Sequence, residues 1–166
     1  EMTMSYGYFH QPNRDVRVAF DLFFRSVPDK GGYAIFAGLQ HVIEFVENLS
    51  FSDADIAYFR KQNLFSEEFL DFLRGFRFRG DIYAMPEGTI IYPNEPLLTI
   101  VAPIIDAQLI ETAILAQINH QSLIATKASR IVRAAEGRCV SDFGARRAHN
   151  MDAATYGARA AYIGGV

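Results

Sequence analysis

Residues 106–137, DAQLIETAILAQINHQSLIATKASRIVRAAEG, form one long helical pattern that divides the chain. Asp106 can cap its start and Gly137 can supply a left-handed stop, so we predict a helix from Asp106 to about Glu136. Frequent Ala, Ser and Thr would let neighbouring elements pack closely against it. One face of the predicted helix contains Leu109, Ala113, Gln117, His120 and Ile124.

The residues before this helix alternate between helical and extended patterns. A first helix is expected to end at Pro12. Residues 14–27 place apolar side chains at every second position, which predicts a strand. Phe23 lies on its other face and predicts that both faces are covered at the far end. Residues 33–49 return to three- and four-residue spacing, which predicts a helix with one apolar face.

Two short helices and a group of strands complete this part of the chain. Ser52 with Asp55 fits a capping box, and Ser66 followed by two glutamates is a second start signal. Between Gly80 and Pro103, the extended runs are broken by Pro-Glu-Gly and Pro-Asn-Glu-Pro. Proline at such places favours turns, so we predict three short strands here.

The stretch after the long helix reads as strand, loop and helix. Cys139, Val140 and Phe143 supply the predicted strand, Asp152 the N-cap, and residues 153–163 the helix. A strand followed at once by a helix is the repeating β/α unit of parallel barrels and doubly wound sheets. We therefore expect a mixed fold, α+β with α/β: an α+β domain, the long helix, and the first β/α unit of a second domain.

Composition narrows the classes of function. Half of the 166 residues are hydrophobic and 21% are charged, which is typical of a soluble globular protein. The net charge of −3 argues against duplex nucleic acid as the main partner. No run of eighteen apolar residues occurs, so no membrane partner is expected. Cys139 has no second cysteine to pair with, which favours a reducing compartment. We expect a cytoplasmic protein, and the residues at both ends are typical of a piece of a longer chain.

Arg146 and Arg147 come just past the end of the predicted strand. Ligands of parallel α/β folds bind at that end of the strands, and a guanidinium group matches a carboxylate or phosphate bidentately. Adjacent residues leave a strand end in different directions, so one arginine could face a ligand and the other a subunit contact. Ion pairs with surface acids are the alternative. Asp142 could orient a ligand group or Arg146, or pair with a neighbour.

Other polar residues allow simpler interpretations. Lys127, Arg130 and Arg133 could face a phosphate, but cations suit a helix C-terminus, and a solvated or intersubunit face is favoured. His120 is more readily a hydrogen-bonded core residue than a catalyst. The histidines show no metal-ligand spacing with one another or with Cys139, so no metal site is expected. The sequence shows no phosphate-binding loop or nucleophile motif, and we expect no catalytic residue within it.

Several long stretches, taken in order, resemble the N-terminal third of the nicotinate phosphoribosyltransferase family. They are TMSYGYF (3–9), FDLFFR (20–25), GYAIFAGLQHVIEFVENL (32–49), FRGDIYAMPEGTIIYPNEPLLTIVAPIIDAQLIET (78–112), INHQSLIATKASRIVRAAEGR (118–138) and FGARRAHNMDAATYGARAAYIGG (143–165).

This resemblance implies an N-terminal α/β sandwich domain over residues 1–105, a long connecting helix over 106–137, and the first β/α unit of an incomplete barrel-like domain over 138–166. It also implies synthesis of nicotinate mononucleotide from nicotinate and phosphoribosyl pyrophosphate, coupled to ATP hydrolysis, in NAD salvage. Mg²⁺ is the expected cofactor. A homodimer with its active site between the subunits is expected.

The resemblance also assigns roles to residues. Arg146 matches the family arginine beside the nicotinate and ribose-phosphate site, and Arg147 is the second member of that pair. Phe143 matches a position that stacks on the pyridine ring, as an aromatic face can do. Residues 149–151 read His-Asn-Met where the family usually has Gln-Gly-Pro, which alters the backbone options of this loop. The histidine that ATP phosphorylates is expected beyond Val166.

Two alternatives stay open at this point. A relative that uses quinolinate or nicotinamide would change the substrate but not the class of reaction. The chain could also act only as a folding, dimerisation or binding module, and in isolation it is expected to be inactive, because a barrel cannot close with one β/α unit.

Overall fold

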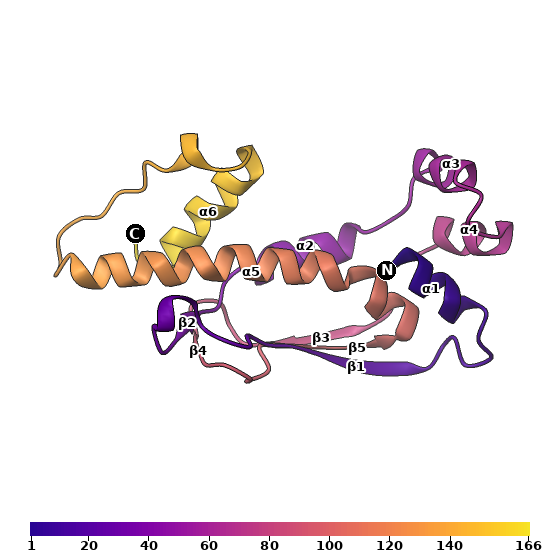
Figure 1. Cartoon of the computed structure of the whole chain (residues 1–166), viewed down its shortest axis with the longest axis horizontal. Coiled ribbons are helices and arrows are strands. Elements are labelled where there is room, and N and C mark those ends of the chain that lie inside the picture. Colours follow the sequence, from indigo (N-terminus) through magenta and orange to yellow (C-terminus); the bar gives the residue numbers. More distant parts are fainter. The chain divides into compact units, whose positions relative to one another are not determined.

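The computed structural model describes residues 1–166, which form two compact units. Unit 1 comprises Glu1–Phe20, Ile43–Ile82 and Ile100–Thr112, and unit 2 comprises Asp21–Val42, Tyr83–Thr99 and Ala113–Val166. The elements mix helices with short strands in the order shown in Figure 1, so the expected mixed α and β composition is confirmed. The predicted domain boundaries at residues 105 and 137 stay a prediction.

The strands form two small sheets. One has the order β1 (Arg17–Leu22), β5 (Leu98–Pro103), β3 (Asp81–Ala84), and the other pairs β2 (Ala34–Ile35) with β4 (Ile90–Ile91) antiparallel. The three short strands predicted after residue 80 are therefore confirmed.

The alternation predicted for β1 is present along the middle of the strand. Val18 and Phe20 are half-buried and Leu22 is buried, while the residues between them are exposed. The predicted burial of Phe23 is wrong, because this side chain is 43% exposed. The strand has ended at Leu22, so the period of two no longer fixes which way Phe23 points.

Unit 1 is built on aromatic packing between short helices. These are α1 (Met2–Phe9), α3 (Asp53–Lys61) and α4 (Glu67–Arg74). The capping box predicted for α3 is confirmed: the Ser52 hydroxyl accepts from the Asp55 amide, and the Asp55 carboxylate accepts from the Ser52 amide. The buried core contains Ile56, Phe69, Leu70, Leu73, Phe76, Ile105 and Leu109.

The helix predicted over residues 33–49 begins later than expected, as α2 (Leu39–Asn48). Ile35 lies in β2, and a short 3-10 turn, η1 (Pro28–Lys30), precedes this strand. Gly38 has φ of +108°, a value that ends the extended backbone and starts the helix. The same apolar positions can fit a helical period or a short buried strand. For this reason the sequence pattern did not show that the chain changes from strand to helix at Gly38.

The long helix is α5 (Ile104–Ala134), and Gly137 has the predicted left-handed backbone with φ of +83°. The predicted cap is wrong, because Asp106 lies inside the first turn. Its fully buried carboxylate instead accepts from the Arg79 amide at 2.9 Å and pairs with the Arg79 guanidinium at 2.9 Å. A buried acid without that partner would be costly, so the ion pair explains why Asp106 stands here.

The strand predicted around residues 139–143 is also wrong. Residues 138–144 adopt no regular structure, and a 3-10 turn, η2 (Ala145–Arg147), leads to α6 (Met151–Ile163). An extended segment becomes a strand only by pairing with a neighbour, and none of the five strands pairs with this one. The Asn150 side chain accepts from the Ala153 amide at 2.7 Å and is the N-cap of α6, while Asp152 lies in the first turn.

Within unit 2, α5 is attached to the β2 region by hydroxyl groups. The Thr126 hydroxyl accepts from the Ile35 amide at 2.8 Å. The Ser122 hydroxyl accepts from the Ala37 amide at 3.0 Å and donates to the Ala37 carbonyl at 3.1 Å. α6 lies against the part of α5 that follows Ala113 (Figure 1). None of the helices is long and apolar enough to cross a membrane.

Candidate functional site

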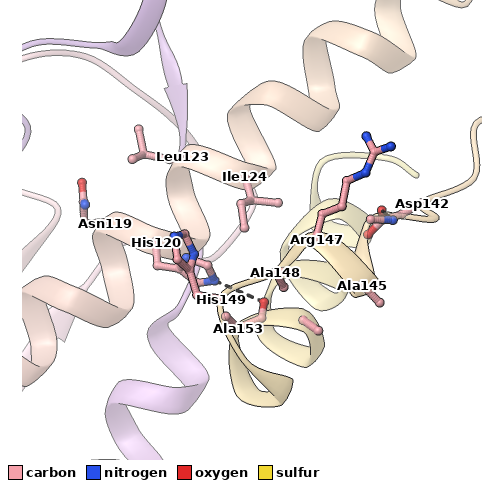
Figure 2. Close-up of a pocket in the computed structure, with 13 residues that line it drawn as sticks. Asn119, His120, Leu123, Ile124, Asp142, Ala145, Arg147, Ala148, His149 and Ala153 are labelled. Carbon is pink, nitrogen blue, oxygen red and sulfur yellow. Dashed lines mark hydrogen bonds between the residues drawn. The ribbon is translucent and has the colours of Figure 1, made fainter.

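A cavity of about 500 Å³ opens in unit 2 between α5, the η2 turn and the start of α6 (Figure 2). Helix α5 contributes polar and apolar side chains, η2 contributes Arg147, and the segment before η2 contributes Asp142. The lining residues are Asn119, His120, Leu123, Ile124, Asp142, Gly144, Ala145, Arg147, Ala148, His149, Ala153, Ala154 and Gly157.

The η2 turn separates the two arginines. Arg147 lines the cavity, whereas Arg146 is not among the lining residues. Both side chains are exposed and neither forms an ion pair, so the alternative of pairing with surface acids is absent from this structure. In the view of Figure 2 the Arg147 guanidinium extends away from the two histidines. A free guanidinium at the mouth of a cavity can hold an anionic group.

The start of this turn is organised by Asp142. Its carboxylate accepts from the Gly144 amide at 2.7 Å, and the Arg147 amide donates to the Gly144 carbonyl at 2.8 Å. Asp142 therefore shapes the backbone that presents Arg147, and it also lines the cavity. It does not pair with Arg146, which was one of the roles considered for it.

Phe143 is 84% exposed and does not line the cavity. The ring is therefore not placed against the cavity in this structure, and its stacking role stays a prediction. Its exposure follows from the missing strand, because no neighbouring strand holds the backbone of residues 138–144.

Two histidines lie on one side of the cavity (Figure 2). The Nε2 atom of His120 is 3.4 Å from the Ala153 carbonyl oxygen, as expected for a hydrogen-bonded residue, but His120 is half-buried at the cavity and does not lie in the core. His149 is exposed and comes from the loop that departs from the family pattern. Its position at the cavity was not predicted, because loop geometry depends on the turn that precedes it.

The close approach of α6 to α5 depends on small residues. A Cβ atom on Gly157 would lie 3.2 Å from the Ile124 side chain, and one on Gly164 would lie 2.5 Å from the Ala125 carbonyl oxygen. Glycine at these places lets the helix lie close enough to form one wall of the cavity. Close packing was predicted from the small residues of the long helix, and the Ala- and Gly-rich composition of residues 153–165 is the corresponding signal on α6.

The basic residues near the end of α5 pair within the chain. Lys127 Nζ lies 2.6 Å from the Asp29 carboxylate, and Arg130 lies 3.2 Å from it. Arg130 also donates to the carbonyls of Pro28 and Tyr33. The hydrogen bond and the charge of Lys127, with the more distant Arg130, lower the pKa of Asp29. Lys127 and Arg130 therefore bind groups of the η1 turn. This does not favour the interpretation that Lys127, Arg130 and Arg133 face a phosphate.

The structure contains no cluster of three or more His, Cys, Asp or Glu residues that could hold a metal ion. No site for a resident Mg²⁺ is assigned to the residues of this chain. A divalent cation bound to a pyrophosphate takes oxygen donors from that ligand.

The chain is similar to known nicotinate phosphoribosyltransferases. The family model of the nicotinate phosphoribosyltransferase (NAPRTase) N-terminal domain matches residues 1–119. The nicotinate phosphoribosyltransferase pncB2 of Mycobacterium tuberculosis is 50% identical over 99% of the chain and 35% of its own length. The Bacillus subtilis nicotinate phosphoribosyltransferase is 46% identical over 99% of the chain and 34% of its own length.

Solved structures of a nicotinic acid phosphoribosyltransferase and of a nicotinate-nucleotide pyrophosphorylase are also similar to the chain. The crystal structure of human nicotinic acid phosphoribosyltransferase is similar with a TM-score of 0.89 and 29% identity, covering 99% of this chain and 34% of that chain. The crystal structure of nicotinate-nucleotide pyrophosphorylase from Pyrococcus furiosus is similar with a TM-score of 0.69 and 31% identity. The match covers 90% of this chain and 31% of that chain. The chain spans about a third of the length of the curated relatives it matches.

Proposed function

Because this chain belongs to the nicotinate phosphoribosyltransferase family, we propose that it forms the N-terminal part of an enzyme that makes nicotinate mononucleotide in NAD salvage. The substrates are nicotinate and phosphoribosyl pyrophosphate, with ATP hydrolysis coupled to the transfer. The observation that supports this most is the similarity to nicotinate phosphoribosyltransferases over 99% of the chain, at 50% identity in the relative from M. tuberculosis.

The residues proposed to bind substrate are Arg146, Arg147 and Phe143. Nicotinate carries a carboxylate, and phosphoribosyl pyrophosphate carries phosphates, so each substrate offers an anion to a guanidinium fork. Arg147 lines the cavity, and Arg146 lies beside it in the same turn. Of the two arginines, Arg146 is the one that the family resemblance places beside the nicotinate and ribose-phosphate site. Phe143 would stack on the pyridine ring after a shift of the segment before η2.

The reaction proposed is displacement at the anomeric carbon of the ribose. The pyridine nitrogen forms the new bond to this carbon as the bond to pyrophosphate breaks. The arginines hold charge and orientation, and no side chain of this chain is assigned proton transfer. Mg²⁺ bound to phosphoribosyl pyrophosphate would supply charge neutralisation for the leaving group, and no residue of this chain is proposed to hold it. The phosphorylated histidine that would couple ATP hydrolysis is expected beyond Val166.

The remaining parts of the proposal concern assembly and location. A homodimer with the active site shared between subunits, and a cytoplasmic location, are proposed from the family resemblance. Small molecules are the proposed ligands, and neither nucleic acid nor membrane is proposed as a partner.

The test is turnover by the full-length gene product with nicotinate, phosphoribosyl pyrophosphate, Mg²⁺ and ATP, followed as nicotinate mononucleotide formed. Nicotinamide and quinolinate replace nicotinate in parallel reactions. Product from nicotinate alone supports the proposal, and product from another base instead replaces it with that relative. If no base yields product, the proposed function is refuted, and the alternative of a folding or dimerisation module is supported.

The residue assignment has its own variants. Arg146→Ala and Arg147→Ala should each lower kcat/KM by about 10- to 100-fold, the effect of losing one charge-assisted hydrogen bond. Arg138→Ala is the matched control, because its side chain is 77% exposed and contacts only the nearby Ala135 and Glu136. Normal kinetics of Arg146→Ala for both substrates would remove that residue from the site.

A further inference from the structure

Glu87 and Arg159 form a two-point ion pair between residues 72 positions apart. Arg159 Nη1 donates to Glu87 Oε1 at 2.9 Å, and Nη2 donates to Oε2 at 2.5 Å. The side chains are only 18% and 28% exposed. Arg159 also donates to the Gln40 side-chain oxygen at 2.9 Å. Parallel hydrogen bonds of this kind fix the orientation of both groups as well as their distance.

The same carboxylate also holds the beginning of α2. Glu87 Oε1 accepts from the amides of Gly38 at 2.6 Å and Leu39 at 3.0 Å. Gly38 can present its amide there because its φ of +108° suits glycine, and a Cβ atom would lie 2.9 Å from the Gln117 carbonyl oxygen. Glu87 therefore links the loop between β3 and β4, the first turn of α2, and α6.

Other contacts also hold α6, and they do not depend on charge. Its Ala160 and Ala161 are buried, and the Tyr156 ring lies 4.1 Å from the His41 ring, centroid to centroid. Removing the ion pair therefore leaves an apolar face that keeps α6 on the chain. The substitution removes the two-point constraint on the rotation of α6 about its axis and on its position along that axis.

The rotation and position of α6 matter because its first half forms a cavity wall. Ala153, Ala154 and Gly157 line the cavity, and the η2 turn with Arg147 lies directly before the helix. Arg159 is two residues beyond Gly157 on the same helix. A displacement of about 1 Å at a binding site is enough to cost on the order of 100-fold in catalytic efficiency.

We infer that Glu87 and Arg159 are positioning residues, which set the place of α6 and of the η2 turn and so determine the affinity of the cavity for its anionic substrates. This inference rests on the function proposed above. Neither residue lines the cavity, so both act through α6 and not by touching substrate.

The test compares Arg159→Met, Glu87→Gln and the double variant in the full-length gene product. Each single variant should raise KM for nicotinate or phosphoribosyl pyrophosphate by roughly tenfold, while kcat changes by less than about threefold. The double variant should be no worse than the poorer single variant, because each substitution already removes the pair. Arg159→Lys keeps a charge near Glu87 and should recover part of the affinity.

Two controls separate positioning from a general loss of structure. Arg138→Met removes an exposed arginine that makes no such pair and should leave both kinetic constants unchanged. Glu87→Gln keeps a side-chain oxygen that can accept from the Gly38 and Leu39 amides. This variant therefore still tests the inference if Arg159→Met does not fold. An unchanged KM in a folded variant of either residue contradicts the inference, whatever happens to kcat.

Hydrogen exchange distinguishes failure of this inference from failure of the proposed function. Amides of residues 144–157 should exchange faster in Glu87→Gln than in the wild type, and those of α3 should not. Wild-type protein that makes no product refutes the proposed function. Unchanged exchange across residues 144–157 refutes the positioning role, with or without activity.

Discussion

The two compact units of this chain are held together by different means. Unit 1 packs large rings: Phe69 lies 5.1–6.0 Å, centroid to centroid, from the rings of Tyr6, Phe9, Phe65 and Phe72. Unit 2 packs small residues, with Ala37, Ala125 and Ala160 fully buried, and joins distant segments through hydroxyls and ion pairs. Unit 1 has one buried contact of this kind, between Arg79 and Asp106, but in unit 2 directional polar contacts join α5 and α6 to distant segments.

This difference suits the two units to different tasks. Apolar packing tolerates shifts of a side chain at modest cost as long as the volume is filled. A hydrogen bond or a bidentate ion pair specifies distance and angle, and weakens steeply when either changes. A cavity wall formed by a helix needs the second kind of contact, because the wall must stay within a fraction of an ångström.

The largest effect should come from breaking the ring cluster. Phe69→Ala removes a fully buried ring from unit 1 and should lower the free energy of unfolding by about 3–5 kcal/mol, measured by urea denaturation. Tyr58→Ala is the matched control on α3, because that ring is 61% exposed. A loss below about 1 kcal/mol at Phe69 would mean that the cluster does not form the core of unit 1.

A smaller effect should come from a single hydroxyl of unit 2. Thr126→Val keeps the shape of the side chain but leaves the buried Ile35 amide without an acceptor. The expected loss in free energy of unfolding is about 1–3 kcal/mol, the cost of an unsatisfied buried donor. Ser129→Ala is the matched control, since its hydroxyl donates only to the Thr126 carbonyl within α5. Equal effects of the two substitutions would contradict a special role for the β2 contact.

The sequence was sufficient where structure depends on neighbours along the chain. The capping box at Ser52 and Asp55 lies within four residues, and the left-handed stop at Gly137 depends only on the last turn of the long helix before it. The same local rules named Asp152 as the cap of α6, and this was wrong. The cap is Asn150, whose extended backbone with φ of −161° precedes the helix.

The sequence was insufficient where contacts join distant residues. Glu87 and Arg159 are separated by 72 positions, and nothing near either residue indicates the other. The predicted strand at residues 139–143 has suitable side chains but no neighbouring strand to pair with. At the cavity, the position of Arg147 follows from the η2 turn, whereas the sequence pattern had placed both arginines after a strand.

The smallest of the three stability effects should be a pH dependence that originates in unit 2. Burial raises the pKa of Glu87, but the hydrogen bonds from Arg159 and the Gly38 amide outweigh it and hold this pKa below its ordinary value of 4.5. A carboxyl with a lowered folded-state pKa stabilises the fold fully above its unfolded-state pKa. That contribution is lost as the pH falls through the folded-state value.

The wild type should therefore be more stable than Glu87→Gln at pH 7, and the two should converge as the pH falls below 4.5. Urea denaturation at a series of pH values measures this difference. Glu95→Gln is the matched control, because it changes an exposed carboxyl on a turn and should run parallel to the wild type. Glu87→Gln curves that stay parallel to the wild type down to pH 3 would show that the ion pair does not stabilise unit 2, and that apolar packing alone holds α6 in place.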